Sequence, residues 1–299
     1  MEPFRSLLFV PAHRERLLEK APGAGADGLL LDLEDSVPAA EKPAARERAG
    51  EMLQTREGPP RYVRVNGFED EGGAPMVRAD LEAVVRPGLS GVVLPKAESA
   101  EEIQALEAEL DRLESVAGID PGGVEIIPFI ESARGVLFAY AVLTASPRVA
   151  SVCFGSAEDG DLMTDLGCGW SPEGTELFYA RSKVLLEARA AGIDHPLDGV
   201  FPGLDDEKGL VRDAENAKRL GYRGKTVIHP RQVEPVNRVF SPSEREVAHY
   251  TDMIAAFEEA EAAGAGAISF RGKMIDRAMI RKARSVLARA APRNPGQAR

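Results

Sequence analysis

Short apolar runs alternate with longer amphipathic segments along most of the chain. Each run has the length and the apolar composition of a buried strand. Eight strands are predicted on this basis: Ser6–Val10, Gly28–Leu33, Tyr62–Val65, Gly91–Leu94, Val124–Phe129, Ala150–Phe154, Leu197–Phe201 and Lys225–Ile228. Because helical patterns separate these runs, the strands are expected to pair in parallel.

The clearest helical pattern runs from Glu101 to Val116. Its apolar positions recur every three or four residues, so they lie on one face of a helix. They are Ile103, Leu106, Leu110 and Leu113. Ser99, followed three residues later by Glu102, forms a capping box and marks the helix start. This segment is therefore predicted to be one of the helices that connect successive strands.

Charged residues follow several of the predicted strands. The run Asp32-Leu33-Glu34-Asp35 closes the second, Lys96 follows the fourth, Glu131 the fifth and Glu158-Asp159 the sixth. A doubly wound sheet gives the same alternation, but it seldom has eight strands with acids at so many strand ends. The pattern therefore favours a (β/α)8 TIM barrel, in which functional sites form at the C-terminal ends of the strands.

A helical extension is expected beyond the barrel. Ser241-Pro242-Ser243-Glu244 has a serine cap, a proline in the first turn and a glutamate three residues on, which together mark a helix start. This helix is expected to end near Ala263, followed by an extended piece at Ala267–Phe270 and a last helix from Met274 to Ala290. Since a barrel does not need this extension, we expect it to act as a lid or to cross to another subunit. The expected division is a barrel over 1–240, the extension over 241–290 and a disordered tail over 291–299.

The chain has 299 residues and a net charge of −11, which suits one barrel with a terminal addition. The negative charge without a basic cluster excludes nucleic acid and anionic membranes as expected partners and favours small polar substrates or a metal ion. Neither a membrane-spanning run nor a signal peptide is recognisable, so a cytoplasmic protein is expected. Cys153 and Cys168 are too few for a disulfide scaffold or a zinc site, and Cys153 is expected in the core.

Glu131 and Asp159 follow the fifth and sixth predicted strands, which are neighbours in a barrel. Two converging carboxylates, completed by water and substrate oxygens, are typical of a Mg²⁺ site. Each residue alone has an ordinary explanation. An acid in the first turn of a helix is favoured by the helix dipole, and Asp159 lies among other acids of a solvated loop. Only the pairing at adjacent strand ends favours a metal.

Arg64 lies near the end of the third predicted strand. Its guanidinium can bind a carboxylate through two hydrogen bonds, or it can form a salt bridge to Asp32 or Glu34 on the neighbouring strand. These two interpretations are compatible. Lys96 can be a Schiff-base amine, a charge partner for Glu131 or a surface lysine, and its ordinary roles together outweigh the amine.

His229 follows the last predicted strand, where it can bind a ligand or satisfy a backbone group at the turn. His13 and Arg14, with Lys20 further along the next helix, are placed to meet an anionic ligand, although exposed cations at a helix start are common. The sequence contains no Walker A loop, dinucleotide glycine fingerprint, nucleophile elbow or zinc-helix motif. Phosphate-cradling and acyl-enzyme hydrolase functions are therefore disfavoured.

Taken together, the motifs resemble those of the citrate lyase beta-subunit-like family, the HpcH/HpaI-type aldolases that include malyl-CoA, citramalyl-CoA and citryl-CoA lyases. Matching segments extend from Ser6 to about Ala288. The segments are Leu8-Phe9-Val10-Pro11, Ala26 to Val37, Glu41-Lys42 with Ala45-Arg46, Arg64-Val65-Asn66, Leu94-Pro95-Lys96, Pro128 to Ser132, Phe154 to Asp159, Ile228 to Gln232 and Gly272 to Asp276. Their order and spacing make the resemblance specific.

The resemblance implies a (β/α)8 barrel in a homotrimer or a hexamer formed by two trimers. It implies that Glu131 and Asp159 hold Mg²⁺, that Arg64 holds the substrate carboxylate, and that Asp32 and Glu34 support the metal and its waters. A small-molecule acyl-CoA and a 2-oxo acid are the implied substrates.

Further roles implied by the resemblance concern residues away from the strand ends. Asp276, in the C-terminal lid, would enter a neighbouring subunit's site as acid or base. Arg14 and Lys20 match positions that contact coenzyme A, and the stretch around His229 lines the same cleft.

Two departures from the family pattern stand out. Ala12 replaces the glycine that usually follows Val-Pro, and the segment from Gly155 to Leu166 carries additional residues, including Gly160-Asp161. Asp159 keeps the Ala-Glu-Asp match and is the predicted second metal ligand, with Asp161 as the alternative.

The expected activity is Mg²⁺-dependent, reversible carbon–carbon cleavage of a 3-hydroxy-3-carboxy acyl-CoA. Three alternatives remain open. They are a metal-dependent aldolase acting on a free hydroxy-oxo acid, a Schiff-base aldolase acting through Lys96, and a citryl-carrier-type beta subunit of a multi-protein lyase. Hydrolysis of a malyl-CoA product is also open, because one small substituent in a pocket discriminates by only about 1–3 kcal/mol.

Overall fold

The computed structural model describes residues 4–55, 57–68, 73–262 and 264–290. The chain divides into two compact units, with the boundary between Phe240 and Ser241. Each unit has a hydrophobic core of its own. Among the described helices, none combines the length and the apolar character needed to cross a membrane.

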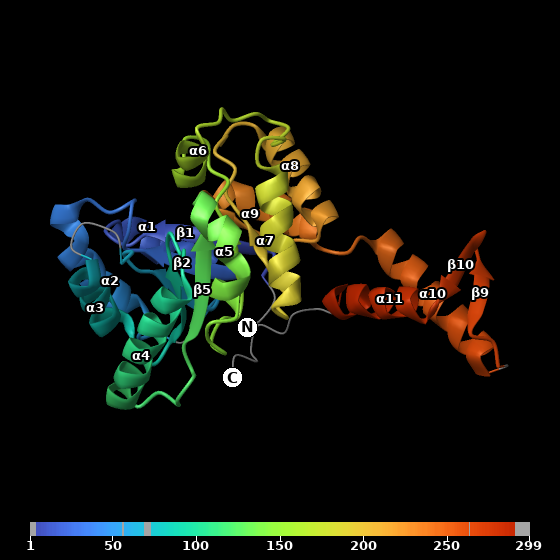
Figure 1. Cartoon of the computed structure of the whole chain (residues 1–299), viewed down its shortest axis with the longest axis horizontal. Coiled ribbons are helices and arrows are strands. Elements are labelled where there is room, and N and C mark those ends of the chain that lie inside the picture. The colour runs from blue at the N-terminus through green and yellow to red at the C-terminus, as the bar shows by residue number, and fades with distance from the viewer. Residues whose placement is uncertain (1–3, 56, 69–72, 263, 291–299) are drawn as a thin grey trace. The chain divides into compact units, whose positions relative to one another are not determined.

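The first unit is a closed barrel of eight parallel strands (Figure 1). The strands are β1 Ser6–Pro11, β2 Gly28–Asp32, β3 Arg61–Arg64, β4 Leu89–Leu94, β5 Glu125–Ile130, β6 Cys153–Phe154, β7 Leu197–Asp198 and β8 Gly224–Val227. Each overlaps a predicted strand, although β6 and β7 are only two residues long. The prediction of a (β/α)8 barrel is therefore confirmed.

Helices follow the strands of the barrel along the chain (Figure 1). They are α1 Glu15–Lys20, α2 Lys42–Met52, α3 Gly73–Val84, α4 Ala100–Ala117, α5 Ala133–Leu143, α6 Asp161–Leu166, α7 Phe178–Ala190, α8 Glu207–Leu220 and α9 Pro230–Phe240, with 3-10 turns η1 Ala21–Ala24 and η2 Ala39–Glu41. The predicted capping box at Ser99 and Glu102 is present at the start of α4.

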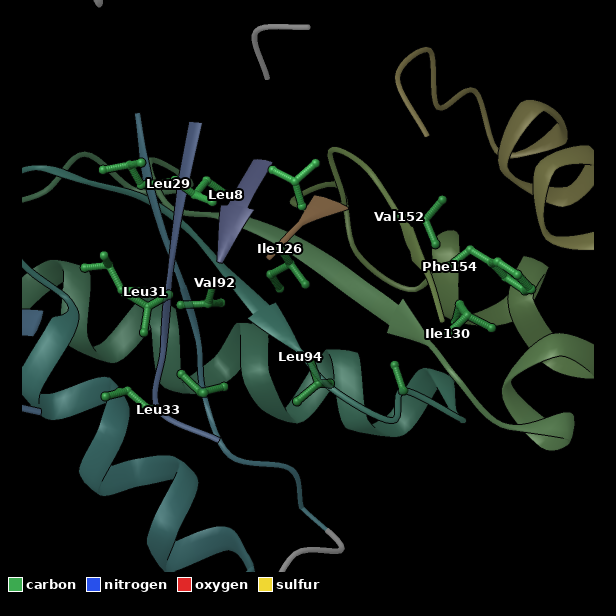
Figure 2. Close-up of a cluster of buried hydrophobic side chains, with 14 of the residues drawn as sticks. Leu8, Leu29, Leu31, Leu33, Val92, Leu94, Ile126, Ile130, Val152 and Phe154 are labelled. Atoms are coloured by element: carbon green, nitrogen blue, oxygen red, sulfur yellow. The ribbon is translucent and has the colours of Figure 1, made fainter. Parts of the chain in front are cut away.

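Side chains along each strand alternate between two cores because successive residues of a strand point to opposite faces. The interior of the barrel is filled by Phe4, Leu7, Leu30, Tyr62, Val93, Ile127, Phe129, Cys153 and Leu197. The alternate positions belong to the larger core that also contains the apolar faces of the helices. Figure 2 shows part of this larger core along β1, β2, β4, β5 and β6.

This alternation also determines which polar residues point inward at the carboxyl ends of the strands. A residue two positions after an interior side chain projects to the same side. Three polar residues have this relation to interior residues of the barrel: Asp32 with Leu30, Arg64 with Tyr62, and Glu131 with Phe129.

A buried ionic network links β7 and β8 to helices α7 and α8. The Lys225 ammonium lies 2.7 Å from Asp198 Oδ2 and also pairs with Asp213. Arg181 Nε lies 3.0 Å from Asp198 Oδ1, and Arg181 Nη2 lies 3.2 Å from Asp213 Oδ1. Burial would raise the pKa of Asp213, but Lys225 and Arg181 together hold this pKa below its ordinary value. Two cations and two carboxylates thus compensate one another beside the two-residue strand β7.

Replacing Lys225 by methionine should lower the free energy of unfolding by about 3–5 kcal/mol, because the substitution leaves two buried carboxylates with one cation. Urea denaturation measures this change. The exposed Lys208 of α8 supplies the matched control, and Lys208→Met should change the unfolding free energy by less than about 0.5 kcal/mol. Equal stability of the two variants would contradict the assignment.

The second unit consists of two helices and a hairpin. It contains α10 Glu244–Ala262, the antiparallel strands β9 Ala267–Phe270 and β10 Lys273–Asp276, and α11 Arg277–Ala290. Its core consists of Met253, Phe257, Ile275, Ile280 and Ala283. The predicted helix from the Ser-Pro-Ser-Glu segment and the predicted extended piece are confirmed.

Two local predictions for this unit were wrong. The last helix begins at Arg277, because Met274 to Asp276 pair with β9 as a strand. The first helix is capped by Ser243, whose hydroxyl accepts a hydrogen bond from Glu246 N–H at 3.2 Å, while Glu246 Oε2 accepts one from Ser243 N–H at 2.9 Å. Two Ser-x-x-Glu patterns overlap here, and the second one forms the capping box. The predicted tail at 291–299 lies outside the described residues.

Candidate functional site

A cavity of about 330 Å³ lies at the carboxyl ends of the barrel strands. Its charged lining residues are Asp32, Asp35, Arg64, Glu131 and Asp161. Its large apolar lining residues are Phe9, Phe129, Leu162, Val200 and Ile228. The cavity therefore combines one cation and four acids with an apolar wall, at the end of the barrel where the sequence predicted the site.

Arg64 is held rigidly at the cavity wall. Its Nε and Nη2 donate to the two oxygens of Asp32 at 2.7 and 2.9 Å, and its Nη1 lies 2.6 Å from Glu34 Oε2. Burial alone would lower the pKa of Arg64, but the charges of Asp32 and Glu34 raise this pKa above its ordinary value. The predicted salt bridges to Asp32 and Glu34 are therefore confirmed, and the guanidinium is a fixed cation.

Glu34 is buried between two cations. Its Oε1 accepts a hydrogen bond from Lys96 Nζ at 2.8 Å, and its Oε2 faces Arg64. Burial raises the pKa of Glu34 to about 7, although Arg64 and Lys96 both lower it. Lys96 thus contacts the site twice, since its backbone N–H also donates to Glu131 Oε1 at 2.9 Å.

Glu131 follows β5 and is buried in the cavity wall. Burial raises the pKa of its carboxyl to about 8; Arg64 opposes this shift, while Glu34 and Asp161 reinforce it. Gly155, after β6, makes this placement possible, because a Cβ at Gly155 would lie 2.5 Å from the Cβ of Glu131. The ends of β5 and β6 can approach this closely only with glycine at that position.

Asp161, rather than Asp159, lines the cavity with Glu131. Asp161 begins α6, which follows β6, whereas Asp159 is exposed in the preceding turn with a φ of 56°. No group of three His, Cys, Asp or Glu side chains in the described residues is arranged to hold a metal ion. Two carboxylates completed by water and ligand oxygens can hold a hard divalent cation, which would also relieve the repulsion between the acids.

The other predicted barrel residues lie outside the cavity lining of the described structure. Arg14 and Lys20 are exposed at the two ends of α1, after β1. His229 Nδ1 accepts a hydrogen bond from the backbone N–H of Arg231 at 3.1 Å, so the imidazole caps the first turn of α9. Its neighbour Ile228 lines the cavity instead.

Asp276 belongs to the second unit, at the junction of β10 and α11. Its Oδ1 accepts hydrogen bonds from the backbone N–H groups of Ala278 and Met279 at 2.9 and 3.1 Å. The carboxylate therefore caps the last helix, a role that sequence reasoning had not assigned to it.

The aromatic residues Phe9 and Phe129 had not been predicted as site residues. The Arg64 guanidinium carbon lies 4.9 Å from the centroid of the Phe9 ring, and the two phenyl rings are 6.3 Å apart. Phe9 follows Leu7 by two positions, as Phe129 follows Ile127, so both residues share the register of the barrel interior. This alternation was the signal in the sequence that could have identified them.

Comparison with known proteins places the chain in a family. The model of the HpcH/HpaI aldolase/citrate lyase family matches residues 5–230, and the chain belongs to this family. The citrate lyase subunit beta of Leuconostoc mesenteroides subsp. cremoris is 39% identical over 285 residues, covering 95% of this chain and 92% of that protein. The (3S)-malyl-CoA thioesterase of Cereibacter sphaeroides is 38% identical over 290 residues, covering 96% and 95%.

A solved structure extends this similarity over both units. CitE from Mycobacterium tuberculosis, in complex with magnesium, acetoacetate and coenzyme A, is 31% identical and matches with a TM-score of 0.75. The match covers 97% of this chain and 99% of that protein. The resemblance inferred from the sequence motifs is therefore confirmed.

Proposed function

We propose that this protein is a cytoplasmic, Mg²⁺-dependent carbon–carbon lyase. It reversibly cleaves a 3-hydroxy-3-carboxy acyl-CoA, such as malyl-, citramalyl- or citryl-CoA, to acetyl-CoA and a 2-oxo acid. The observation that carries this proposal is the convergence of Glu131, Asp161 and the fixed guanidinium of Arg64 in one cavity. Membership of the family, together with the ligands bound by the related CitE structure, supports it.

Glu131 and Asp161 are the proposed ligands of Mg²⁺, with Asp161 replacing the sequence-based choice of Asp159. The ion would act as a Lewis acid that stabilises the developing alkoxide of the substrate. Asp32 and Glu34 contribute indirectly, because they hold Arg64 beside the metal ligands.

Replacing Asp161 by asparagine should weaken Mg²⁺ binding at least tenfold, because the substitution removes one of two anionic ligands. Asp159→Asn should change the affinity less than twofold, and Glu131→Ala should abolish both binding and turnover. Isothermal titration with MgCl₂ measures the three affinities. A larger loss in Asp159→Asn than in Asp161→Asn would restore the original assignment.

Arg64 is proposed to bind the substrate carboxylate. Three of its donors serve Asp32 and Glu34, which leaves donors on its terminal nitrogens for a ligand. Cleavage requires loss of the substrate hydroxyl proton, rupture of the carbon–carbon bond and protonation of the thioester enolate at carbon. Arg64 would orient the carboxylate and offset the negative charge of the neighbouring alkoxide, from which the carbonyl of the 2-oxo acid forms.

Asp276 is the proposed acid or base at the acyl carbon, supplied by the second unit of a neighbouring subunit in a homotrimer or hexamer. Its place at the start of α11 gives the carboxylate a fixed orientation through two backbone hydrogen bonds.

Arg14 and Lys20 are proposed to contact the phosphates of coenzyme A, and the turn at His229 to border the same cleft. Arg14 and His229 come shortly after the carboxyl ends of β1 and β8, whereas Lys20 is the last residue of α1.

Asp276→Asn should lower kcat by about 10²–10⁴ in both cleavage and condensation, as expected for loss of general acid–base catalysis. The asparagine retains a side-chain oxygen for the helix cap, so the unfolding transition should be nearly unchanged. Steady-state assays in both directions measure kcat. Parent-like activity in both directions would eliminate the proposed role of Asp276.

A panel of malyl-CoA, citramalyl-CoA, citryl-CoA and a free hydroxy-oxo acid tests the function itself. At least one CoA thioester should be cleaved to acetyl-CoA and a 2-oxo acid, and EDTA should abolish the reaction until MgCl₂ is restored. Following free thiol and 2-oxo acid separately distinguishes cleavage from hydrolysis. Cleavage of the free hydroxy-oxo acid alone, or of no substrate, would overturn the proposal.

Two alternatives derive from the relatives. Similarity to (3S)-malyl-CoA thioesterase favours hydrolysis of the thioester as a second candidate activity, which would appear in the same assay as free thiol without a 2-oxo acid. Similarity to citrate lyase subunit beta favours a substrate carried on a protein instead of CoA. Activity restricted to a carrier-bound thioester would identify that case.

A further inference from the structure

Lys42 is the first residue of α2, is half-buried and is not among the residues that line the cavity. Its ammonium donates to the backbone carbonyls of Leu33 and Glu34 at 3.0 and 3.2 Å, and to the side-chain oxygen of Asn66. An ammonium has three donors, so these three acceptors use all of them. A long, flexible side chain is thereby fixed in one conformation at a cost in rotamer entropy.

The acceptors of Lys42 belong to the segments that carry the site. Leu33 and Glu34 directly follow β2, and Asn66 follows Arg64 by two residues at the end of β3. The amide of Asn66 donates to the Leu33 carbonyl at 3.2 Å, so the two strand ends are also joined directly.

Asn66 is in turn held from helix α3. Its backbone N–H and its side-chain amide both donate to Asp80 Oδ2, at 2.8 and 2.6 Å. Asp80 is completely buried, and its other oxygen accepts a hydrogen bond from Arg46 Nε at 2.6 Å. Helices α2 and α3 therefore anchor both segments through one continuous polar network.

The backbone that Lys42 holds is restrained on its other side by a residue of the cavity wall. Asp32 accepts hydrogen bonds from the backbone N–H of Glu34 at 3.1 Å and of Ser36 at 3.2 Å. Lys42 binds the carbonyl groups of the same segment. Asp32 therefore holds the backbone N–H groups around Glu34, while Lys42 holds the backbone carbonyl groups. The Glu34 carboxylate then contacts both Arg64 and Lys96.

We propose that Lys42 is a positioning residue, which orients Glu34 and through it the carboxylate-binding guanidinium of Arg64. This inference rests on the proposed function of Arg64. It predicts a selective defect: binding of the 2-oxo acid should depend on Lys42, whereas binding of coenzyme A at α1 should not. A residue that only stabilised the fold would affect both ligands alike.

The test uses the full-length protein with MgCl₂ and measures the dissociation constants of pyruvate, glyoxylate and coenzyme A by calorimetry. Lys42→Met should weaken binding of the 2-oxo acid at least tenfold and change binding of coenzyme A less than twofold. Lys42→Gln, which keeps two donors, should give an intermediate loss and preserves the test if the methionine variant does not fold.

Lys183 on α7 provides a matched control. Its half-buried ammonium likewise donates to two backbone carbonyls, of Val136 and Leu137, and to a side-chain oxygen, of Glu187. Lys183→Met therefore removes a similar set of hydrogen bonds away from the cavity lining. It should leave all three dissociation constants within twofold of the parent.

Any of three results would overturn the inference while leaving the proposed function intact. The Lys42 variants could bind the 2-oxo acid within twofold of the parent, they could lose coenzyme A binding equally, or Lys183→Met could lose 2-oxo acid binding equally. If the parent protein binds neither 2-oxo acid in the presence of MgCl₂, the proposed function fails, and the inference fails with it.

Discussion

The ion pair between Arg64 and the two acids Asp32 and Glu34 is the interaction on which the site depends. Burying a guanidinium is costly unless its hydrogen bonds are made, and here Asp32 binds it through two oxygens while Glu34 binds a third nitrogen. The result is a cation that cannot be deprotonated and cannot move freely, at the wall of an acidic cavity. A ligand carboxylate would therefore find its partner already oriented.

The barrel makes this arrangement possible through its strand register. Asp32 and Arg64 are paired across β2 and β3, and both continue the inward-facing register of residues that fill the barrel. Glu131 follows the interior residue Phe129 by two positions, so its side chain also points inward. Gly155 lets the end of β6 approach Glu131 closely. The alternation of side chains along each strand therefore places both the apolar side chains of the barrel interior and the charged side chains of the cavity.

The charged side chains that line the cavity are consistent with the proposed chemistry. Four acids and one cation line it, and burial raises the pKa of Glu131 to about 8. Such a cluster is unfavourable in isolation and favourable around a divalent cation. The polar network of Lys42, Asn66 and Asp80 restrains the backbone that directly follows β2 and β3, next to Asp32 and Arg64.

The sequence by itself determined the eight strands, the fold class and the family, and it predicted Asp32, Glu34, Arg64 and Glu131 as candidate site residues. It could do so because apolar periodicity and strand ends are local features of the chain. Two features were decided only by the tertiary structure: Asp161 rather than Asp159 lines the cavity, and Lys96 pairs with Glu34. Each feature depends on the distance between side chains that follow different strands. The spacing of residues along the chain does not determine this distance.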